Sequence, residues 1–272
     1  MQPTYEDKIP KSLLNKGTGS LVAYTHTLNP YAGCVYGCSY CYVRQMPVSL
    51  FRGMPWGSWV DIKREAAELL RKELLKARRK GKVTIFMSSS TDPYQPIEYK
   101  EGVTRSLLEA MLDEPPDFLL VQTRSPLVTR DIDLLQAMGD RVRVSMTVET
   151  DLESIRKRFS PSAPPIPARI RALAALKEAG VPAQATIAPL LPSSEAFPAI
   201  LASVADRICI DDYFMGDGAG GRRTAKLGIA DIYKELGMEE WYGRDAYRFL
   251  LERMKTIFRE EQIRIGQAGF AP

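Results

Sequence analysis

Residues 82–123, KVTIFMSSSTDPYQPIEYKEGVTRSLLEAMLDEPPDFLLVQT, contain one complete strand–helix–strand unit. The β-rich runs at 82–88 and 117–123 predict two strands, and residues 102–113 between them follow a helical pattern. Parallel strands need a crossover connection, which is usually a helix. This unit therefore predicts two parallel strands of one sheet.

Similar units recur along the chain, and together they predict the fold. Repeated strand–helix units predict an α/β protein whose parallel sheet is either doubly wound or curled into a barrel. Six strands favour a partial (β/α)6 TIM-type barrel, because the complete barrel has eight. The further strands are expected at 20–28, 141–148, 182–191 and 206–214, and the further helices at 60–80, 129–138, 166–179 and 194–204.

We expect the barrel to occupy residues 20–221, after an N-terminal extension at residues 1–19. Residues 222–272 have a strongly helical pattern and are expected to form a helical C-terminal extension packed on the barrel. The 272-residue chain is 45% hydrophobic, which is enough to bury a core. Because the sequence has neither a long apolar run nor a secretory signal, we expect a cytoplasmic protein without a membrane partner.

Three of the four cysteines, Cys34, Cys38 and Cys41, lie close together with the spacing C-x3-C-x2-C. They follow the first predicted strand, where the active-site loops of βα-barrels gather. Soft thiolates select zinc or iron–sulfur clusters, and structural zinc takes four protein ligands. Three ligands leave one position open, which on a four-iron cluster is an iron able to bind an external ligand. The alternatives are a zinc site completed by His26 or Cys209, or three merely buried cysteines.

The stretch CVYGCSYCY (34–42) resembles the cluster motif of the radical S-adenosylmethionine (radical SAM) superfamily. Further motifs, in the same order, resemble the spore photoproduct lyase-like branch of that superfamily. These motifs are LNPYAGC (28–34), SSSTDPYQPIE (88–98), VQTRSPLVTRD (121–131), VSMTVET (144–150), APLLP (188–192) and DDYFMGDGAGGRRT (211–224).

The resemblance implies an enzyme with a [4Fe-4S] cluster and SAM. The cluster cleaves SAM reductively, and the resulting 5′-deoxyadenosyl radical abstracts a hydrogen atom from a substrate. A reductase with flavodoxin or ferredoxin would supply the electron. DNA or RNA is a candidate substrate, which the net charge of +4 permits without requiring; a peptide or small metabolite is the alternative. A non-catalytic iron–sulfur or zinc protein with a structural or redox role is the other hypothesis. The oligomeric state does not follow from the sequence.

The resemblance also implies SAM contacts at the ends of successive strands. An aromatic residue of the cysteine motif would pack near the adenine, serines after the second strand would receive the methionyl amine, and an arginine after the third would bind the carboxylate. In the fourth strand, alternating polar side chains share one face and suit the ribose. The expected contacts are Tyr40, Ser88, Ser89, Ser90, Arg124, Ser145, Thr147 and Glu149.

The residues expected to contact the substrate are indicated by less specific sequence patterns than the SAM contacts. Asp92 and Tyr94 follow the second strand and are expected to shape the substrate pocket. In spore photoproduct lyases, a further cysteine in this region returns a hydrogen atom to the substrate. This chain has serines there, so the resemblance does not imply thymine-dimer repair. Cys209, Tyr94 or Tyr213 is the candidate that would supply or relay the hydrogen atom instead.

Overall fold

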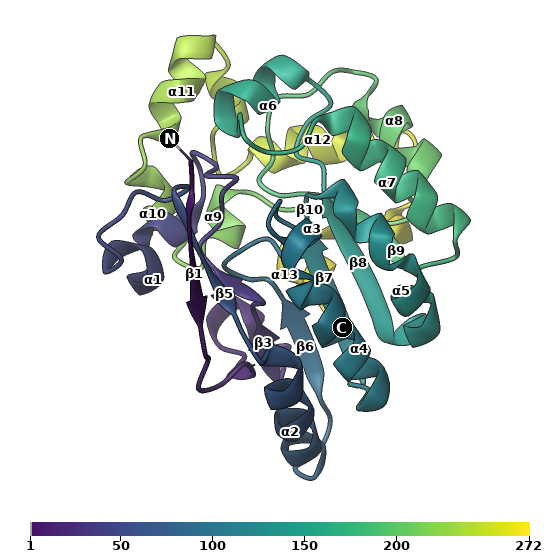
Figure 1. Ribbon diagram of the computed structural model, residues 1–272. Helices are drawn as coiled ribbons and strands as arrows, with labels where there is room; N and C mark the ends of the chain where they lie inside the picture. The colour runs from purple at the N-terminus through teal and green to yellow at the C-terminus, as the bar shows by residue number, and fades with distance from the viewer. Residues whose placement is uncertain (1) are drawn as a thin grey trace.

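The computed structural model describes residues 2–272, and its central element is a mostly parallel sheet (Figure 1). Within these residues, eight strands are hydrogen-bonded in the order β11-β10-β9-β8-β7-β6-β3-β2. All neighbours are parallel except β2 and β3. The strands are β2 (Asn15–Lys16), β3 (His26–Leu28), β6 (Thr84–Met87), β7 (Phe118–Thr123), β8 (Val142–Thr147), β9 (Ala183–Ile187), β10 (Ile208–Ile210) and β11 (Ile263–Ile265).

The six strands predicted from the sequence correspond to β3 and to β6 through β10, which confirms the partial TIM-type fold. Within residues 2–272 the sheet does not close, because β2 and β11 remain at its edges. Every residue of β6 is buried, and β7 is buried except at one position. Such burial on both faces is typical of parallel strands covered by crossover helices.

The predicted helix at 60–80 begins later than expected. Residues 60–63 belong to β5 (Trp59–Lys63). Helix α2 (Ala66–Arg78) starts only after Glu65, because the φ of 56° at Glu65 is not a helical backbone conformation. The segment VDIK alternates apolar and polar side chains, which is the pattern of a half-buried strand. β5 pairs with β1 (Thr4–Lys8) and β4 (Tyr31–Ala32) in a small separate sheet, so the helical prediction is wrong for these residues.

The C-terminal segment contributes a strand as well as helices. β11 pairs in parallel with β10, which places residues 263–265 in the main sheet. The following helix lies so close to β10 that a Cβ atom on Gly269 would be 2.0 Å from Cys209 Sγ. Residues 222–272 therefore share the main sheet with the barrel.

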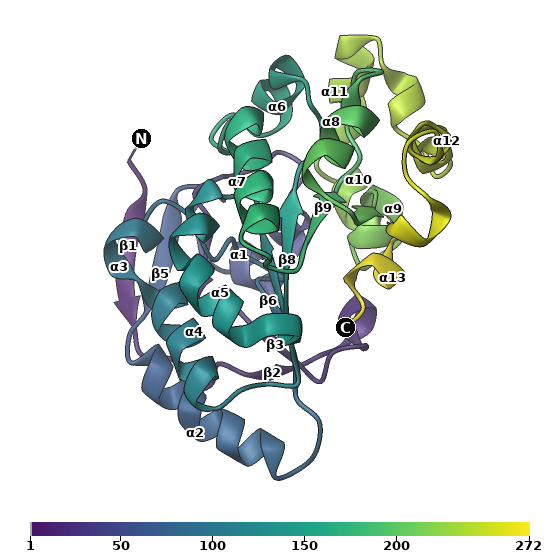
Figure 2. The same ribbon diagram turned by 90° about the vertical axis from the view of Figure 1, so that its right-hand side faces the viewer.

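Helices cover the sheet and extend beyond its β10–β11 edge (Figures 1 and 2). In Figure 2, α2, α4, α5 and α7 lie along one face of the sheet, whereas α11 and α12 lie on the far side of β9. No helix in residues 2–272 is long and apolar enough to cross a membrane. The remaining helices are α1 (Pro47–Leu50), α3 (Glu98–Glu101), α4 (Val103–Asp113), α5 (Ile132–Met138), α6 (Glu153–Phe159), α7 (Ile166–Glu178), α8 (Phe197–Val204), α9 (Tyr213–Gly216), α10 (Arg222–Ala225), α11 (Ile229–Leu236), α12 (Ala246–Lys255) and α13 (Gln267–Phe270).

Candidate active site

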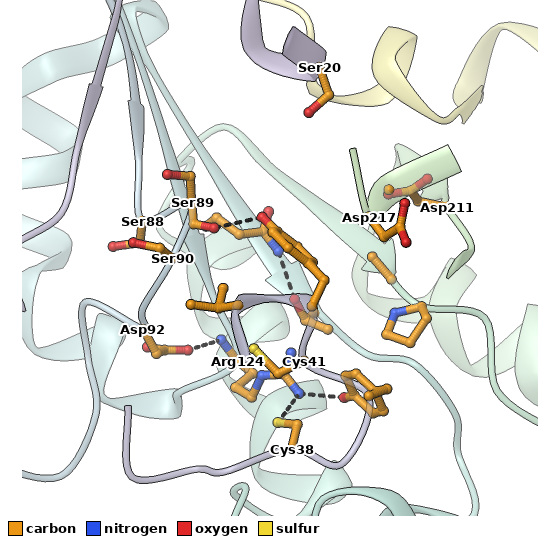
Figure 3. A pocket seen from close by; sticks show the side chains of 18 of the residues that line it. Ser20, Cys38, Cys41, Ser88, Ser89, Ser90, Asp92, Arg124, Asp211 and Asp217 are labelled. Atoms are coloured by element: carbon orange, nitrogen blue, oxygen red, sulfur yellow. Dashed lines mark hydrogen bonds between the residues drawn. The ribbon is translucent and has the colours of Figure 1, made fainter. Parts of the chain in front are cut away.

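A pocket lies at the carboxyl ends of the parallel strands (Figure 3). Its walls are the cysteine loop, the segments that follow β6, β7, β9 and β10, and the end of β8. Ser20 and Phe270, from opposite ends of the chain, also line it. Active sites of βα-barrels gather at this edge, because the loops after successive strands converge there.

All three clustered cysteines line this pocket, on the loop between β4 and the 3-10 helix η2 (Tyr42–Gln45). Arg44 holds the loop, since its guanidinium donates to the carbonyl oxygens of Gly37 and Cys38 at 2.6 and 3.0 Å. Burial raises the pKa of the Cys34 and Cys41 thiols, the latter to about 11. A metal centre would supply the positive charge that the thiolates need.

The donor set fits an iron–sulfur cluster better than a zinc ion. Three soft thiol donors line one pocket, as a cluster with one open iron requires. Neither His26 nor Cys209 lines the pocket, so neither lies where a fourth zinc ligand would be needed. Within residues 2–272, no three or more His, Cys, Asp or Glu side chains are arranged to hold a single metal ion.

Arg124, which follows β7, connects the cysteine loop to the end of β8. Its Nη1 lies 3.3 Å from Cys38 Sγ, 2.6 Å from Tyr40 Oη and 3.3 Å from Glu149 Oε1. Burial alone would lower the pKa of Arg124, but these three neighbours outweigh it and raise the pKa. A guanidinium that stays charged therefore lies directly beside a candidate cluster ligand.

Glu149, predicted as a ribose contact, is held by the protein itself and does not line the pocket. Its Oε1 accepts from Tyr40 Oη at 2.9 Å, and its Oε2 accepts from Arg169 Nη1 at 2.5 Å. Burial opposes ionisation, but Arg169 and Arg124 outweigh it and lower the pKa of Glu149. In this arrangement Glu149 is a positioning residue for Tyr40 and Arg124 rather than a direct contact.

Ser145 and Thr147, the two predicted contacts that lie in β8, differ from one another. Ser145 is buried below the pocket, where its Oγ lies 2.5 Å from Thr186 Oγ1 and accepts from Gln184 Nε2 at 3.1 Å. Thr147 does line the pocket, and its hydroxyl accepts from Gln122 Nε2 at 2.7 Å. Of the three SAM contacts predicted in the fourth strand, the structure brings only Thr147 to the cavity.

The three serines after β6 all line the pocket (Figure 3). Ser88 has a φ of 75°, which residues other than glycine rarely adopt, and its buried hydroxyl has no hydrogen-bond partner among residues 2–272. Ser89 and Ser90 are fixed through their backbones, by Tyr42 Oη at 2.7 Å and Asn29 Oδ1 at 3.1 Å. A strained residue with an unused hydroxyl in a pocket points to a ligand.

The candidate substrate-side residues fall into two groups. Asp92 and Tyr213 line the pocket, whereas Tyr94 and Cys209 do not. Both oxygens of Asp92 accept hydrogen bonds from its neighbours, including Thr123 Oγ1 at 2.7 Å, so Asp92 organises the loop. The Cys209 sulfur points to α13, with Gly266 O at 3.9 Å, and this makes it a poor hydrogen-atom donor to the cavity.

Sequence reasoning missed an acidic pair. Asp211 and Asp212 line the pocket directly after β10. In the sequence they stand out only as part of the motif at 211–224. Two consecutive carboxylates at the end of a buried strand were the signal that could have identified them.

Comparison with known proteins identifies the family. The model of the Radical SAM superfamily matches residues 28–198, which include the three clustered cysteines and every residue named above from β6 to β9. The chain belongs to the radical SAM superfamily. This membership confirms the resemblance seen in the cysteine motif.

Similarity to individual proteins extends over most of the chain. An uncharacterized protein of Methanocaldococcus jannaschii is 34% identical over 167 residues, which are 61% of each chain. The chain spans about three fifths of the length of the curated relatives it matches. A spore photoproduct lyase mutant matches 97% of this chain and 82% of its own with a TM-score of 0.67 and 14% identity. Another mutant, with bound AdoMet and dinucleoside spore photoproduct, gives a TM-score of 0.63 at 15% identity, with the same coverage. These structures share the fold of this chain.

Proposed function

We propose that this radical SAM protein is an enzyme that abstracts a hydrogen atom from a substrate bound in the pocket at the carboxyl ends of β6, β7, β8 and β10. The observation that carries the proposal is the convergence of three thiols, a charged arginine and an unpartnered serine hydroxyl on one cavity. Cys34, Cys38 and Cys41 would hold a [4Fe-4S] cluster. When bound, the cluster and SAM supply one-electron cleavage of SAM and a 5′-deoxyadenosyl radical.

The chain's own residues would bind SAM and exclude water. The Ser88 hydroxyl is available to accept from the methionyl ammonium, because no neighbour within residues 2–272 forms a hydrogen bond with it. Arg124 stays cationic beside Cys38 and is suited to the carboxylate of SAM. Tyr40 is held by Glu149 and Arg124 through its hydroxyl, and its ring would pack near the adenine of SAM. Thr147 is the candidate ribose contact.

The second part of the proposal concerns the class of substrate. The relative with bound dinucleoside spore photoproduct makes a nucleic acid or nucleotide one candidate, and a peptide or small metabolite is the other. We do not propose thymine-dimer repair, because no thiol other than those of the clustered cysteines lines the pocket within residues 2–272. Tyr213 does line it and is the remaining candidate for hydrogen-atom relay. A reduced flavodoxin or ferredoxin would supply the electron.

Formation of 5′-deoxyadenosine tests the proposal. The protein is reconstituted anaerobically with iron and sulfide, reduced, and incubated with SAM. We expect 5′-deoxyadenosine from the unchanged protein and none from Cys38→Ala. Cys209→Ala is the matched control, since it removes a buried thiol outside the pocket and should retain the reaction. Equal product from Cys38→Ala, or a tightly bound zinc in place of iron, would reject the proposal in favour of a structural or redox site.

A further inference from the structure

The acidic pair after β10 has hydrogen-bonding capacity that the protein does not use. Asp211 and Asp212 line the pocket, although their side chains belong to residues only 7% and 5% exposed. Asp211 Oδ1 and Asp212 Oδ2 have no hydrogen-bond partner among residues 2–272. Because buried polar atoms are normally paired, two such oxygens in one cavity point to a ligand with donor groups.

The two other carboxylates that line the pocket accept hydrogen bonds through both of their oxygens. Asp92 accepts from neighbouring N–H and hydroxyl groups through both oxygens. Asp217 is likewise satisfied by the loop that follows it, where its oxygens accept from the backbone N–H groups of Ala219, Gly221 and Arg223 at 2.7, 2.9 and 2.8 Å. These two carboxylates therefore stabilise loops, and the unused capacity belongs to Asp211 and Asp212.

The fold holds both carboxylates in place. Asp212 is the N-cap of α9, and its Oδ1 accepts from the N–H groups of Phe214 and Met215 at 2.8 and 2.7 Å, which leaves Oδ2 free. Asp211 packs against Gly216, where a Cβ atom would lie 2.3 Å from Asp211 Oδ2. The glycine thus makes room for a carboxylate that forms no internal hydrogen bond through Oδ1.

The positive charges of the described chain leave this pair largely uncompensated. Burial raises the pKa of Asp212 and outweighs the charge of Arg244, which lowers it. None of the salt bridges within residues 2–272 involves Asp211 or Asp212. Arg124, which lines the same pocket, is engaged by Cys38, Tyr40 and Glu149. Burial and the neighbouring charge of Asp212 raise the pKa of Asp211 to about 7. A bound cation would favour the ionised carboxylates and so oppose the effects of burial and of like charge on the pKa.

We propose that Asp211 and Asp212 form a substrate subsite for a cationic nitrogen group, either an ammonium or a guanidinium. The inference rests on the proposed function, since it names the substrate class of that same pocket. Asp211 lies across the cavity from Ser88, Ser89 and Ser90 (Figure 3), so a substrate cation need not compete with the methionyl ammonium of SAM.

Other ligands fit this subsite less well. A phosphate would face two carboxylates, so the backbone of a nucleic acid is disfavoured here. Residues 2–272 contain no group of three or more acidic, histidine or cysteine side chains arranged for a single metal ion, so a metal held mainly by protein side chains is not indicated here. A nitrogen cation needs only hydrogen-bond acceptors and negative charge, which the pair supplies.

Ligand binding to the cluster-bearing, SAM-loaded protein tests the subsite. Saturation-transfer NMR under anaerobic conditions would compare butylammonium, butylguanidinium, the peptides Gly-Lys-Gly and Gly-Arg-Gly, neutral cytidine, and anionic butyrate. The free amines and the peptides distinguish a small metabolite from a basic side chain. We expect the cationic probes to bind, and Asp211→Asn to weaken them about tenfold or more. Asp140→Asn is the control, because Asp140 is exposed in η4 (Gly139–Arg141), before β8 and outside the pocket.

The affinity for SAM, measured by equilibrium dialysis on the same variants, separates the subsite from the cofactor site. We expect unchanged SAM affinity in Asp211→Asn. Equal binding of butyrate or cytidine and the cations, or equal loss of SAM and cation binding, would overturn the inference. If 5′-deoxyadenosine is absent while cation binding still depends on Asp211, the proposed function fails and the subsite stands.

Discussion

Replacing Arg169 by methionine should strongly destabilise the protein, because Arg169 is a buried partner of Glu149. Arg169 lies on α7 and is completely buried. It donates to Glu149 Oε2 at 2.5 Å, to Thr147 O at 3.2 Å and to Pro164 O at 2.9 Å. Methionine preserves much of the apolar stem but leaves these three acceptors without their donor.

The expected loss follows from the charge that remains. Removing one partner of a buried ion pair costs about 3–5 kcal/mol, since the other charge stays buried without compensation. Tyr40 and Arg124 still contact the other oxygen of Glu149, so we expect the lower end, about 3 kcal/mol. Adding Glu149→Gln removes the negative charge that Arg169 no longer compensates, and it should recover part of the lost stability.

Urea unfolding of the cluster-bearing protein, followed anaerobically by circular dichroism, measures the effect. Arg171→Met is the matched control, because Arg171 lies on the same helix and is exposed. We expect the control to change the free energy of unfolding by less than about 0.5 kcal/mol. A loss in Arg169→Met no larger than in the control, or no recovery on adding Glu149→Gln, would refute the reasoning.

Two further predictions concern packing and ionisation. Gly269→Ala should destabilise the protein by about 1–3 kcal/mol, because its Cβ would meet Cys209 Sγ at 2.0 Å, and Cys209→Ala should restore part of the loss in thermal unfolding. Asp211→Asn should become more stable relative to the unchanged protein as pH rises. The pKa of Asp211 is raised from 3.8 to about 7, so the ionised form is disfavoured in the folded state, and the stability of the unchanged protein falls as pH rises through this range. The variant should gain about 2–3 kcal/mol between about pH 5 and about pH 8, and a difference that does not vary with pH would contradict this.

The main strands were predictable because they are buried, apolar and separated by helical segments. β6 and β7 belong to such runs, and their order in the sequence is their order in the sheet. β11 was not predictable in the same way. It contains only three residues, IRI, with an arginine at its centre, and its place in the sheet depends on pairing with β10. β5 was missed because a short alternating segment directly precedes a helical pattern.

In the site, spacing along the chain identified the cysteines, whereas contacts between distant residues determined the rest. Glu149 looked available for a ligand, but its partner Arg169 lies on α7, twenty positions further along the chain, and occupies one of its oxygens. Cys209 looked available to the barrel interior, but α13 packs against its sulfur. Such outcomes depend on tertiary packing, which local patterns do not contain.

Metal analysis combined with electron paramagnetic resonance tests the central claim most directly. The protein is purified and reduced anaerobically, and its spectrum is recorded before and after SAM is added. We predict about four iron and four sulfide per chain, and a cluster signal that SAM changes, because three cysteines leave one iron without a protein ligand. A zinc-containing protein without iron, or a cluster whose signal SAM leaves unchanged, would contradict the account.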